Sequence, residues 1–367
     1  MSTAKPLGVY VHVPFCEKKC PYCDFYSAPG NEKKYNDYTG AVVSRIRSLG
    51  EKLGRRGDTL YFGGGTPSLL GEQRLCEMIS AAKDAFGNNF SEITIEVNPT
   101  RLAPDFTVLK SAGVNRISVG LQSADENELR ALGRMHTCED ALRCIAQAHD
   151  AGIDNVSADL MLAVPHQTTE TLRRSIKFCI DAGVSHISAY ILKIEPGTVF
   201  AKKQNELSLP DDDEAAELYE TLCSELRGCG WRHYEISNFC RDDMRGLHNL
   251  KYWHDEEYIG IGPSAHSFIG GKRFFTPRRM QSFLDGITVD DGEGGTEEEY
   301  IMLALRLDEG VRAKAFCERF RYDLPGKYLS RAAALQSHGL VTVSSSDFSL
   351  TEKGFLLSNS IIAELLR

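Results

Sequence analysis

The first half of the chain alternates short apolar runs with longer amphipathic stretches. Each apolar run has the length and the Val and Ile content of a buried strand, and each following stretch has apolar residues at helical spacing. The sequence predicts strands over residues 8–13, 59–62, 92–97, 116–120, 155–160 and 186–192. It predicts helices between them, among which are residues 35–49, 73–85, 139–151 and 169–182.

Three of the expected helix ends share an Ala-Gly signal, at Gly113, Gly152 and Gly183. Glycine suits the position after a helix because it adopts left-handed backbone angles without strain. A strand follows each time, and regular alternation of strand and helix implies parallel strands with right-handed crossovers. Periodicity alone leaves both a doubly wound sheet and an incomplete barrel open. In either fold, functional residues are expected at the carboxyl ends of the strands.

The pattern changes after about residue 205. Pro210 and the aspartates after it open a helix that extends to Arg227, and a less regular region continues to about residue 285. The acidic, glycine-rich stretch 290–295 is typical of a linker, and Thr296 with Glu299 has capping-box spacing. The tail predicts three helices, two short strands near 339–343 and 348–350, and a final helix, as in a small winged-helix-like domain. We therefore expect three parts, residues 1–205, 206–289 and 296–367.

Composition and charge narrow the class of partner. The 367 residues carry a net charge of −9, and residues 297–367 hold nine Lys or Arg against ten Asp or Glu, so we expect no nucleic acid partner. No apolar run reaches the ~18 residues of a membrane span, and the N-terminus lacks a secretory pattern. We expect a soluble, cytoplasmic protein without an integral membrane segment.

A cysteine triplet follows the first expected strand. Most of the eleven cysteines stand singly in helical stretches and are expected to be buried free thiols, whereas Cys16, Cys20 and Cys23 share one loop. Three thiolates can hold three irons of a 4Fe–4S cluster and leave the fourth iron open. S-adenosylmethionine (SAM) can chelate that iron through its amino and carboxylate groups, and an electron from the cluster then cleaves it to a 5′-deoxyadenosyl radical. A zinc site is the alternative, but zinc would need a fourth Cys or His at finger-like spacing, and His12 lies on the strand.

A glycine-rich loop, Gly63-Gly64-Gly65-Thr66, follows the second expected strand. Glycines let a backbone approach a ligand closely, with free N–H and C=O groups to bind the amino acid moiety of SAM. The alternative is a tight turn between strand and helix with no ligand. The position of the loop beside the cysteine triplet favours the ligand-binding interpretation.

Polar residues also follow the next expected strands. Glu96, Gln122 and Asp159 lie near strand ends, and Arg134 lies beyond the fourth strand. The alternative to ligand binding is that each is a surface or capping residue. Ligands of parallel α/β folds, however, bind at these strand ends. Glu96 and Asp159 could accept hydrogen bonds from ribose or ammonium groups, and Arg134 could pair with a carboxylate.

Together these motifs resemble the radical SAM family of oxygen-independent coproporphyrinogen III oxidases and their relatives, over essentially the whole chain. The resemblance rests on residues 10–23, 63–68, 95–99, 120–122, 132–134, 159–161 and 194–198. It implies a partial (β/α)6 radical SAM barrel, with the cluster on the cysteine triplet. It also implies SAM contacts from Tyr10, Tyr22, Gly64, Gly65, Thr66, Glu96, Gln122, Arg134 and Asp159.

Within that family the chain resembles the haem-chaperone group more than the oxidases. The oxidases have a further cysteine where this chain has Phe25, and a long N-terminal extension where only fifteen residues precede Cys16. Residues 248–253, His-Asn-Leu-Lys-Tyr-Trp, match an H-N-x-x-Y-W motif of the chaperone group. The match implies that His248 takes part in haem binding, and Tyr252 would share its helix face. A structural role for His248 is the alternative.

Three functions follow from the resemblance. The first is a binding and delivery protein that holds haem and passes it to haem-requiring proteins, with the cluster and SAM tuning that role. The second is an enzyme of porphyrin biosynthesis that oxidatively decarboxylates coproporphyrinogen III to protoporphyrinogen IX through a SAM-derived radical. The third is a radical SAM enzyme that acts on another substrate.

Overall fold

The computed structural model describes residues 5–100 and 103–367 and is built on one curved, mixed sheet. Its first six strands are parallel and adjacent in chain order, and all six expected strands are confirmed. These strands are β1 (Leu7–Val13), β2 (Gly57–Gly64), β3 (Glu92–Val97), β4 (Arg116–Gln122), β5 (Asn155–Leu162) and β6 (His186–Ile191).

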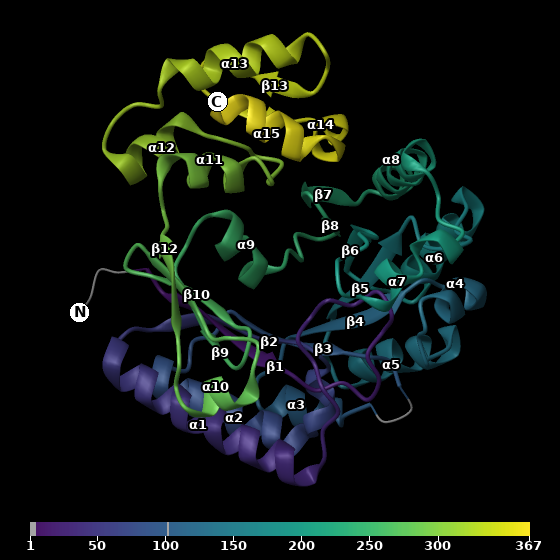
Figure 1. Cartoon of the computed structure of the whole chain (residues 1–367), viewed down its shortest axis with the longest axis vertical. Helices are drawn as coiled ribbons and strands as arrows, with labels where there is room; N and C mark the ends of the chain where they lie inside the picture. Colours follow the sequence, from purple (N-terminus) through teal and green to yellow (C-terminus); the bar gives the residue numbers. More distant parts are fainter. Residues whose placement is uncertain (1–4, 101–102) are drawn as a thin grey trace.

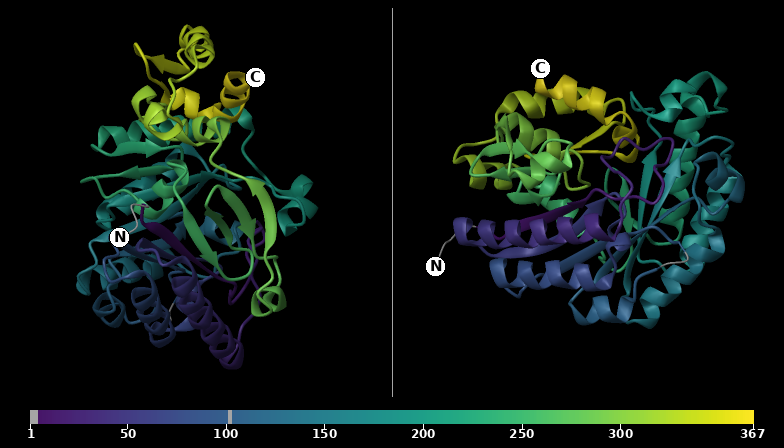
Figure 2. Two further views of the ribbon diagram at one scale, coloured as in Figure 1. Left: turned by 90° about the vertical axis from the view of Figure 1, so that its left-hand side faces the viewer. Right: turned by 60° about the horizontal axis from the view of Figure 1, so that its bottom comes forward.

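Helices connect these strands and cover the convex side of the sheet (Figures 1 and 2). Aliphatic residues of the strands, such as Val11 and Ile95, pack there against helix residues such as Val42 and Met78. The curved sheet with helices on its outer side corresponds to the partial barrel that the resemblance implies. The connecting helices are α1 (Glu32–Leu53), α2 (Glu72–Phe86), α3 (Phe106–Ser111), α4 (Glu126–Ala131), α5 (Cys138–Asp150) and α6 (Thr169–Asp181).

Glycines end three of these helices as the sequence predicts. Gly113, Gly152 and Gly183 directly follow the last turns of α3, α5 and α6, with φ angles of 103°, 78° and 78°. These left-handed angles turn the chain back towards the sheet, so that β4, β5 and β6 can each begin a few residues later.

The region after α6 is more regular than the sequence suggests, because most of it joins the same sheet. Strands β7 (Arg232–Glu235) and β8 (Asn238–Cys240) extend the sheet beyond β6. On the other side β9 (Tyr258–Ile261) pairs with β1, followed outwards by β10 (His266–Ile269) and β11 (Lys272–Phe275). The helices of this region are α7 (Val199–Lys202), α8 (Asp212–Gly228), α9 (Leu247–Trp253) and α10 (Met280–Leu284).

The sequence predicts a linker over residues 290–295, and this prediction is wrong for residues 290–293. Strand β12 (Val289–Glu293) occupies it and pairs with β11 at the outer edge of the sheet. Its five residues are all exposed, and three of them are acidic. Charged residues on an edge strand oppose pairing with other chains, which is why an acidic sequence suits this position.

The C-terminal part has the expected three helices and two strands, followed by two short helices where the sequence predicts one (Figure 1). Thr296 caps its first helix, since its hydroxyl accepts the Glu299 N–H at 3.2 Å. The reciprocal half of the expected capping box is absent, because the Glu299 carboxylate accepts from the Gly295 N–H and from Arg273 instead. The elements are α11 (Glu297–Ala304), α12 (Ala313–Phe320), α13 (Gly326–Gln336), β13 (Val341–Val343), β14 (Phe348–Leu350), α14 (Glu352–Leu356) and α15 (Ser358–Leu366).

Within the described ranges, no helix combines the length and the apolar content that crossing a membrane requires. The expectation that the chain begins without a secretory pattern falls partly on residues 1–4, which lie outside the described residues.

Candidate functional site

The cysteine loop leaves the carboxyl end of β1 and returns to it. The Cys16 N–H donates to the Ala28 carbonyl at 3.2 Å and the Ala28 N–H to the Pro14 carbonyl at 2.9 Å, which closes the base of the loop. The Cys23 N–H donates to the Cys20 carbonyl at 3.1 Å within it. All three cysteines are partly buried free thiols. The loop therefore holds three thiols at the end of the sheet where ligands of such folds bind.

The glycine-rich loop packs directly on the start of the cysteine loop. The Gly65 N–H donates to the Val13 carbonyl at 2.8 Å, and the Thr66 N–H to the Phe15 carbonyl at 2.7 Å. A Cβ atom at Gly65 would lie 2.5 Å from the Phe15 carbonyl oxygen, so a side chain there would force the two loops apart. Glycine is needed here for loop-to-loop contact.

The expectation that N–H groups of the glycine-rich loop stay free for a ligand is wrong. The Gly64 N–H donates to the Glu96 carboxylate at 3.1 Å, and those of Gly65 and Thr66 are used as above. Protein groups thus saturate all three donors. Hydrogen bonds from this loop to SAM would have to use carbonyl oxygens or the Thr66 hydroxyl.

A chain of side-chain contacts connects two of the cysteines across the site. Cys16 Sγ lies 3.5 Å from the Thr66 hydroxyl, which accepts a hydrogen bond from the Asn98 amide at 2.7 Å. The Asn98 carbonyl oxygen accepts from Arg134 Nη2 at 2.7 Å, and Arg134 Nη1 lies 3.5 Å from Cys20 Sγ. Residues at the ends of β2, β3 and β4 thereby hold Cys16, Cys20 and the guanidinium of Arg134 in place.

Asn98 is the site residue that the sequence reasoning missed. It lies directly after β3, two residues beyond Glu96, and so satisfied the strand-end criterion that identified its neighbour. Arg134 was identified, but as a partner of a ligand carboxylate. The structure places its guanidinium against Cys20 and the Gly120 carbonyl, the latter at 2.8 Å. Tyr22 lies beside Arg134 and Cys20, and burial raises the pKa of its phenol.

The donor set of this loop fits a 4Fe–4S cluster better than a zinc ion. Cys16, Cys20 and Cys23 do not all come within 4.8 Å of one another, as the ligands of one small ion would. The ring nitrogens of His12 contact the Tyr10 hydroxyl and the Tyr26 carbonyl, each at 3.0 Å, and none of the three cysteines. Three separated thiols beside a buried guanidinium suit three corners of a cubane.

Two partly buried carboxylates form the other side of the candidate site. Glu96 accepts from the Tyr61 hydroxyl at 2.8 Å, and Asp159 accepts from the Ser118 hydroxyl at 3.1 Å. Burial, and next the charge of Asp159, raise the pKa of Glu96 to about 7. Burial raises the pKa of Asp159 to about 6. A cationic ligand between them would compensate this loss of hydration, and SAM carries both a sulfonium and an ammonium group.

Tyr10 and Gln122 lie at the margins of this arrangement. Gln122 ends β4 with a φ of 69°, at a shift in the pairing with β5. The Tyr10 ring lies 6.2 Å from the Tyr61 ring and 6.3 Å from that of His248. Tyr10 therefore belongs to an aromatic cluster that adjoins the carboxylates.

His248 lies on α9 and is fixed by two ring contacts. Its Nδ1 lies 2.9 Å from the Thr59 hydroxyl and its Nε2 lies 2.7 Å from the Tyr252 hydroxyl. The Tyr61 ring stacks on it at 5.2 Å, and only 1% of the residue is exposed. Burial lowers its pKa to about 3, so the imidazole is neutral. The expectation that Tyr252 shares its helix face is confirmed, and in this conformation both ring nitrogens are occupied.

Glu92 at the start of β3 holds the beginning of α9. Its carboxylate accepts the Leu247 N–H at 2.7 Å and the His248 N–H at 3.1 Å, which satisfies two free donors of that helix. Because Tyr61 both stacks on His248 and donates to Glu96, the helix and the carboxylates share one side chain.

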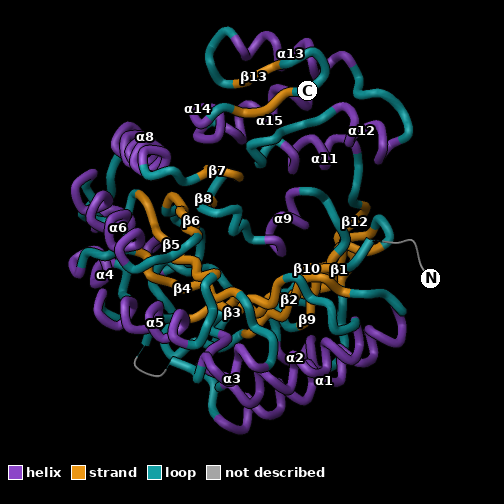
Figure 3. The backbone as a smooth tube through the Cα atoms, turned by 180° about the vertical axis from the view of Figure 1, so that it is seen from behind, coloured by secondary structure: helices purple, strands orange, loops and turns teal. Residues whose placement is uncertain are grey.

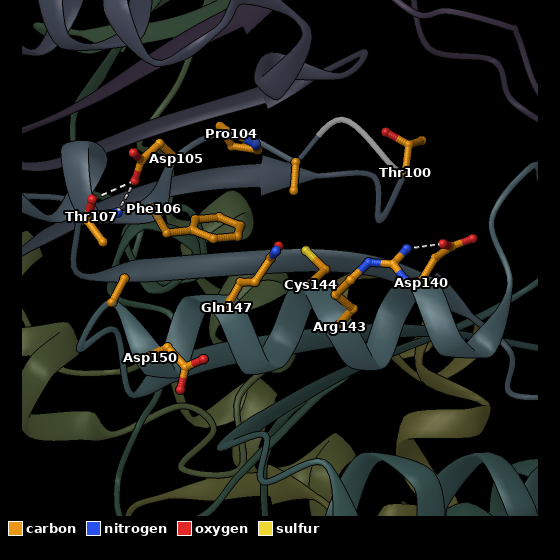
Figure 4. A pocket seen from close by; sticks show the side chains of 12 residues that line it. Thr100, Pro104, Asp105, Phe106, Thr107, Asp140, Arg143, Cys144, Gln147 and Asp150 are labelled. Carbon is orange, nitrogen blue, oxygen red and sulfur yellow. Dashed lines mark hydrogen bonds and ion pairs between the residues drawn. The ribbon is translucent and has the colours of Figure 1, made fainter.

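A groove of about 420 Å³ lies elsewhere, between α3 and α5 on the helical side of the sheet (Figure 4). Phe106, Gln147 and Arg143 line it, and Arg143 is already paired with Asp140. None of the residues that the sequence identifies as candidate ligands borders this groove.

Comparisons with known proteins agree with this arrangement. Residues 10–179 match the Radical SAM superfamily, and residues 298–357 match the HemN C-terminal domain. The chain is 35% identical to "Heme chaperone HemW" of Bacillus subtilis, over 98% of this chain and 99% of that protein. It is 34% identical to the protein of the same name from Escherichia coli, over 97% of each.

The fold also has a solved counterpart. Coproporphyrinogen III oxidase (HemN) from Escherichia coli superposes with a TM-score of 0.83, at 23% identity, over 99% of this chain and 90% of that one. That likeness establishes the fold. Membership of the radical SAM superfamily implies a 4Fe–4S cluster and SAM, which the donor sets described above fit. The sequence identity of 35% and 34% over nearly the whole chain is more specific than superfamily membership. It shows that the chain belongs to the HemW family of radical SAM proteins.

Proposed function

We propose that this protein is a haem chaperone that binds haem and delivers it to haem-requiring proteins. The observation that carries the proposal is the full-length identity to proteins named "Heme chaperone HemW". Phe25 supports it, because the residue two positions after Cys23 is an exposed aromatic and not the further cysteine of the oxidases. The eleven free thiols suit the reducing cytoplasm, where we place the protein.

In this proposal Cys16, Cys20 and Cys23 hold the cluster, which when bound supplies the electron for SAM cleavage. Arg134 contacts the Cys20 sulfur and keeps it in place. Glu96 and Asp159 bind the cationic groups of SAM. The remaining contacts to SAM are assigned to Tyr10, Tyr22, Gly64, Gly65, Thr66 and Gln122.

Haem binding is assigned to α9. Neutral imidazole is the form that ligates haem iron, and burial keeps His248 neutral by lowering its pKa. Ligation requires Nε2 to exchange its contact with the Tyr252 hydroxyl for the iron. Losing such a contact costs about 1 kcal/mol, which a metal–ligand bond can offset. The released Tyr252 and the adjacent Trp253 would then pack against the porphyrin.

The haem acceptors are proposed to be other proteins, because the net charge of −9 disfavours nucleic acid as a main partner. Any contact with a membrane would occur through an acceptor that is itself attached to it.

The proposal is tested by offering the anaerobically reconstituted protein two ligands in separate reactions. With haem, we expect one equivalent to bind tightly and to give a shifted Soret band. With coproporphyrinogen III, SAM and a reductant, we expect no protoporphyrinogen. Turnover of coproporphyrinogen would instead identify an oxidase, and failure to retain haem on gel filtration would contradict the chaperone assignment.

A further inference from the structure

A second group of metal-ligating side chains lies where the C-terminal part meets the sheet edge. Cys223 lies on α8, His233 on β7 and Glu352 at the start of α14, three elements that lie side by side (Figures 1 and 3). One ligand atom from each, a thiol sulfur, a ring nitrogen and a carboxylate oxygen, lies within 4.8 Å of the other two. These residues belong to none of the motifs that define the radical SAM site.

His233 is the observation that points to a ligand. Both of its ring nitrogens are buried and have no hydrogen-bond partner of good geometry, although the backbone of Glu235 and Ile236 lies close to the ring. The ring is held in place by stacking on Phe239, with centroids 4.1 Å apart and planes at 15°, and by contact with Phe355 at 5.1 Å. His233 as a whole is partly buried, but burying its ring nitrogens without good partners costs free energy of folding, because their lost hydration is not replaced. A metal ion would give one nitrogen a partner without moving the ring.

The space beside these residues can take an ion. A cavity of about 180 Å³ is lined by the three residues together with Trp231, Asp308 and others. Arg227 pairs with one oxygen of the Glu352 carboxylate and thereby orients it. The three ligand atoms thus converge on a small cavity whose wall is partly aromatic.

We propose that Cys223, His233 and Glu352 bind a zinc ion. One thiolate, one imidazole and one carboxylate form a donor set that zinc favours, and a water molecule would complete the tetrahedron. On binding, the Cys223 thiol releases its proton to solvent as the zinc–sulfur bond forms, with no change of oxidation state. The ion would fasten α14 of the C-terminal part to α8 and β7 of the sheet edge.

The test uses the full-length protein with its 4Fe–4S cluster reconstituted, so that the cysteine loop does not offer thiols to zinc. After addition of Zn²⁺ and dialysis, we expect one zinc per chain. The zinc K-edge absorption spectrum should show one sulfur ligand with nitrogen and oxygen ligands. Zinc with three sulfur ligands would mean adventitious binding in the cysteine loop and would overturn the proposal.

Variants separate the site from nonspecific binding. Cys223→Ser and Glu352→Gln should each weaken zinc retention at least tenfold, whereas Cys229→Ser, an exposed cysteine just after α8, should not. Arg227→Gln controls for loss of the ion pair to Glu352 and should keep the zinc. Zinc should raise the melting temperature of the wild type and of Cys229→Ser but not of Glu352→Gln. Equal retention in all variants would refute the site.

Discussion

Arg134 is the residue on which the cysteine loop and the strand ends converge. It donates to Asn98 and to the Gly120 carbonyl, and the same guanidinium lies against Cys20. These contacts hold the guanidinium, and with it the Cys20 side chain, in a fixed position relative to the strand ends. The site therefore positions one of its cluster ligands before any metal binds.

The three loop cysteines should each be required for the cluster. Cys20→Ala removes one of only three thiolates in the loop, so iron and sulfide after anaerobic reconstitution should fall to near background. Cys76→Ala and Cys138→Ala are matched controls, since both thiols are partly buried and lie on helices of the outer layer. Full iron content in Cys20→Ala would contradict the cluster assignment.

SAM affinity should depend on pH through Glu96. Its raised pKa of about 7 means that the carboxylate is ionised above that pH, and the ionised form attracts the sulfonium and ammonium groups. Affinity should therefore fall as the pH drops, by roughly tenfold between about pH 8 and about pH 6. Calorimetric titration of SAM into the reconstituted protein measures this.

Glu96→Gln provides the control for that pH dependence. Its affinity for SAM should be lower than that of the wild type by roughly ten- to a hundredfold. That affinity should be almost equal at both pH values, because the variant lacks the titrating carboxylate. A pH profile unchanged in Glu96→Gln would assign the dependence to another group and remove Glu96 from the SAM site.

At the scale of elements, the six parallel strands were predictable because each is an apolar run bounded by helix signals. Strands β7 to β12 were not, since they have three to five residues each and β12 is exposed at every residue. Their strand character comes from pairing with a sheet that is already formed, which local sequence does not encode.

In the candidate site, the glycine-rich loop was likewise only partly predictable from the sequence. Its position after β2 and beside the cysteines was predictable from the repeat. The use of its N–H groups was not, because their acceptors, Val13, Phe15 and Glu96, come from two other strand ends. A glycine needed for contact between two loops and a glycine needed for contact with a ligand give the same sequence pattern.

Helix α9 offers a direct test of haem ligation. If His248 ligates haem through Nε2, Tyr252→Phe should strengthen haem binding by roughly fivefold, because it removes a competing hydrogen bond of about 1 kcal/mol. His248→Ala should abolish the shift in the haem spectrum while cluster content stays unchanged. Absorption titrations of haem measure both.

A purely structural His248 predicts the opposite pattern. Tyr252→Phe would then lower thermal stability and leave haem affinity unchanged, and His248→Ala would lower stability without altering the haem spectrum of the folded protein. That result would show that His248 is not part of the haem site. Family membership alone would then support the proposal of a haem chaperone.

At the scale of the whole molecule, one buried carboxylate connects the sheet to the C-terminal part. The Asp255 side chain is fully buried and pairs with Arg273 of β11 at 3.1 Å and with Arg319 of α12. Arg273 in turn donates to Glu299 of α11 at 2.7 Å. These ion pairs join the two parts on one side, and the proposed zinc site would join them on the other.

Asp255→Ala should therefore destabilise the protein strongly. It leaves the partly buried Arg319 without its carboxylate partner and Arg273 with Glu299 alone, which costs about 3 kcal/mol in the free energy of unfolding. Glu364→Ala, which breaks an exposed pair with Arg367, should cost less than ~1 kcal/mol. Urea denaturation of both variants compares them, and similar losses would show that Asp255 does not hold the two parts together.

Haem transfer is the measurement that tests the central claim most directly. The cluster-reconstituted protein, loaded with one equivalent of haem and freed of excess by gel filtration, is mixed anaerobically with an apo form of a haem enzyme. We predict that haem leaves the chaperone and restores the activity of the acceptor, even when a haem-scavenging apoprotein is present in excess. Haem that reaches the acceptor only by way of free solution, and is therefore intercepted by the scavenger, would contradict the account.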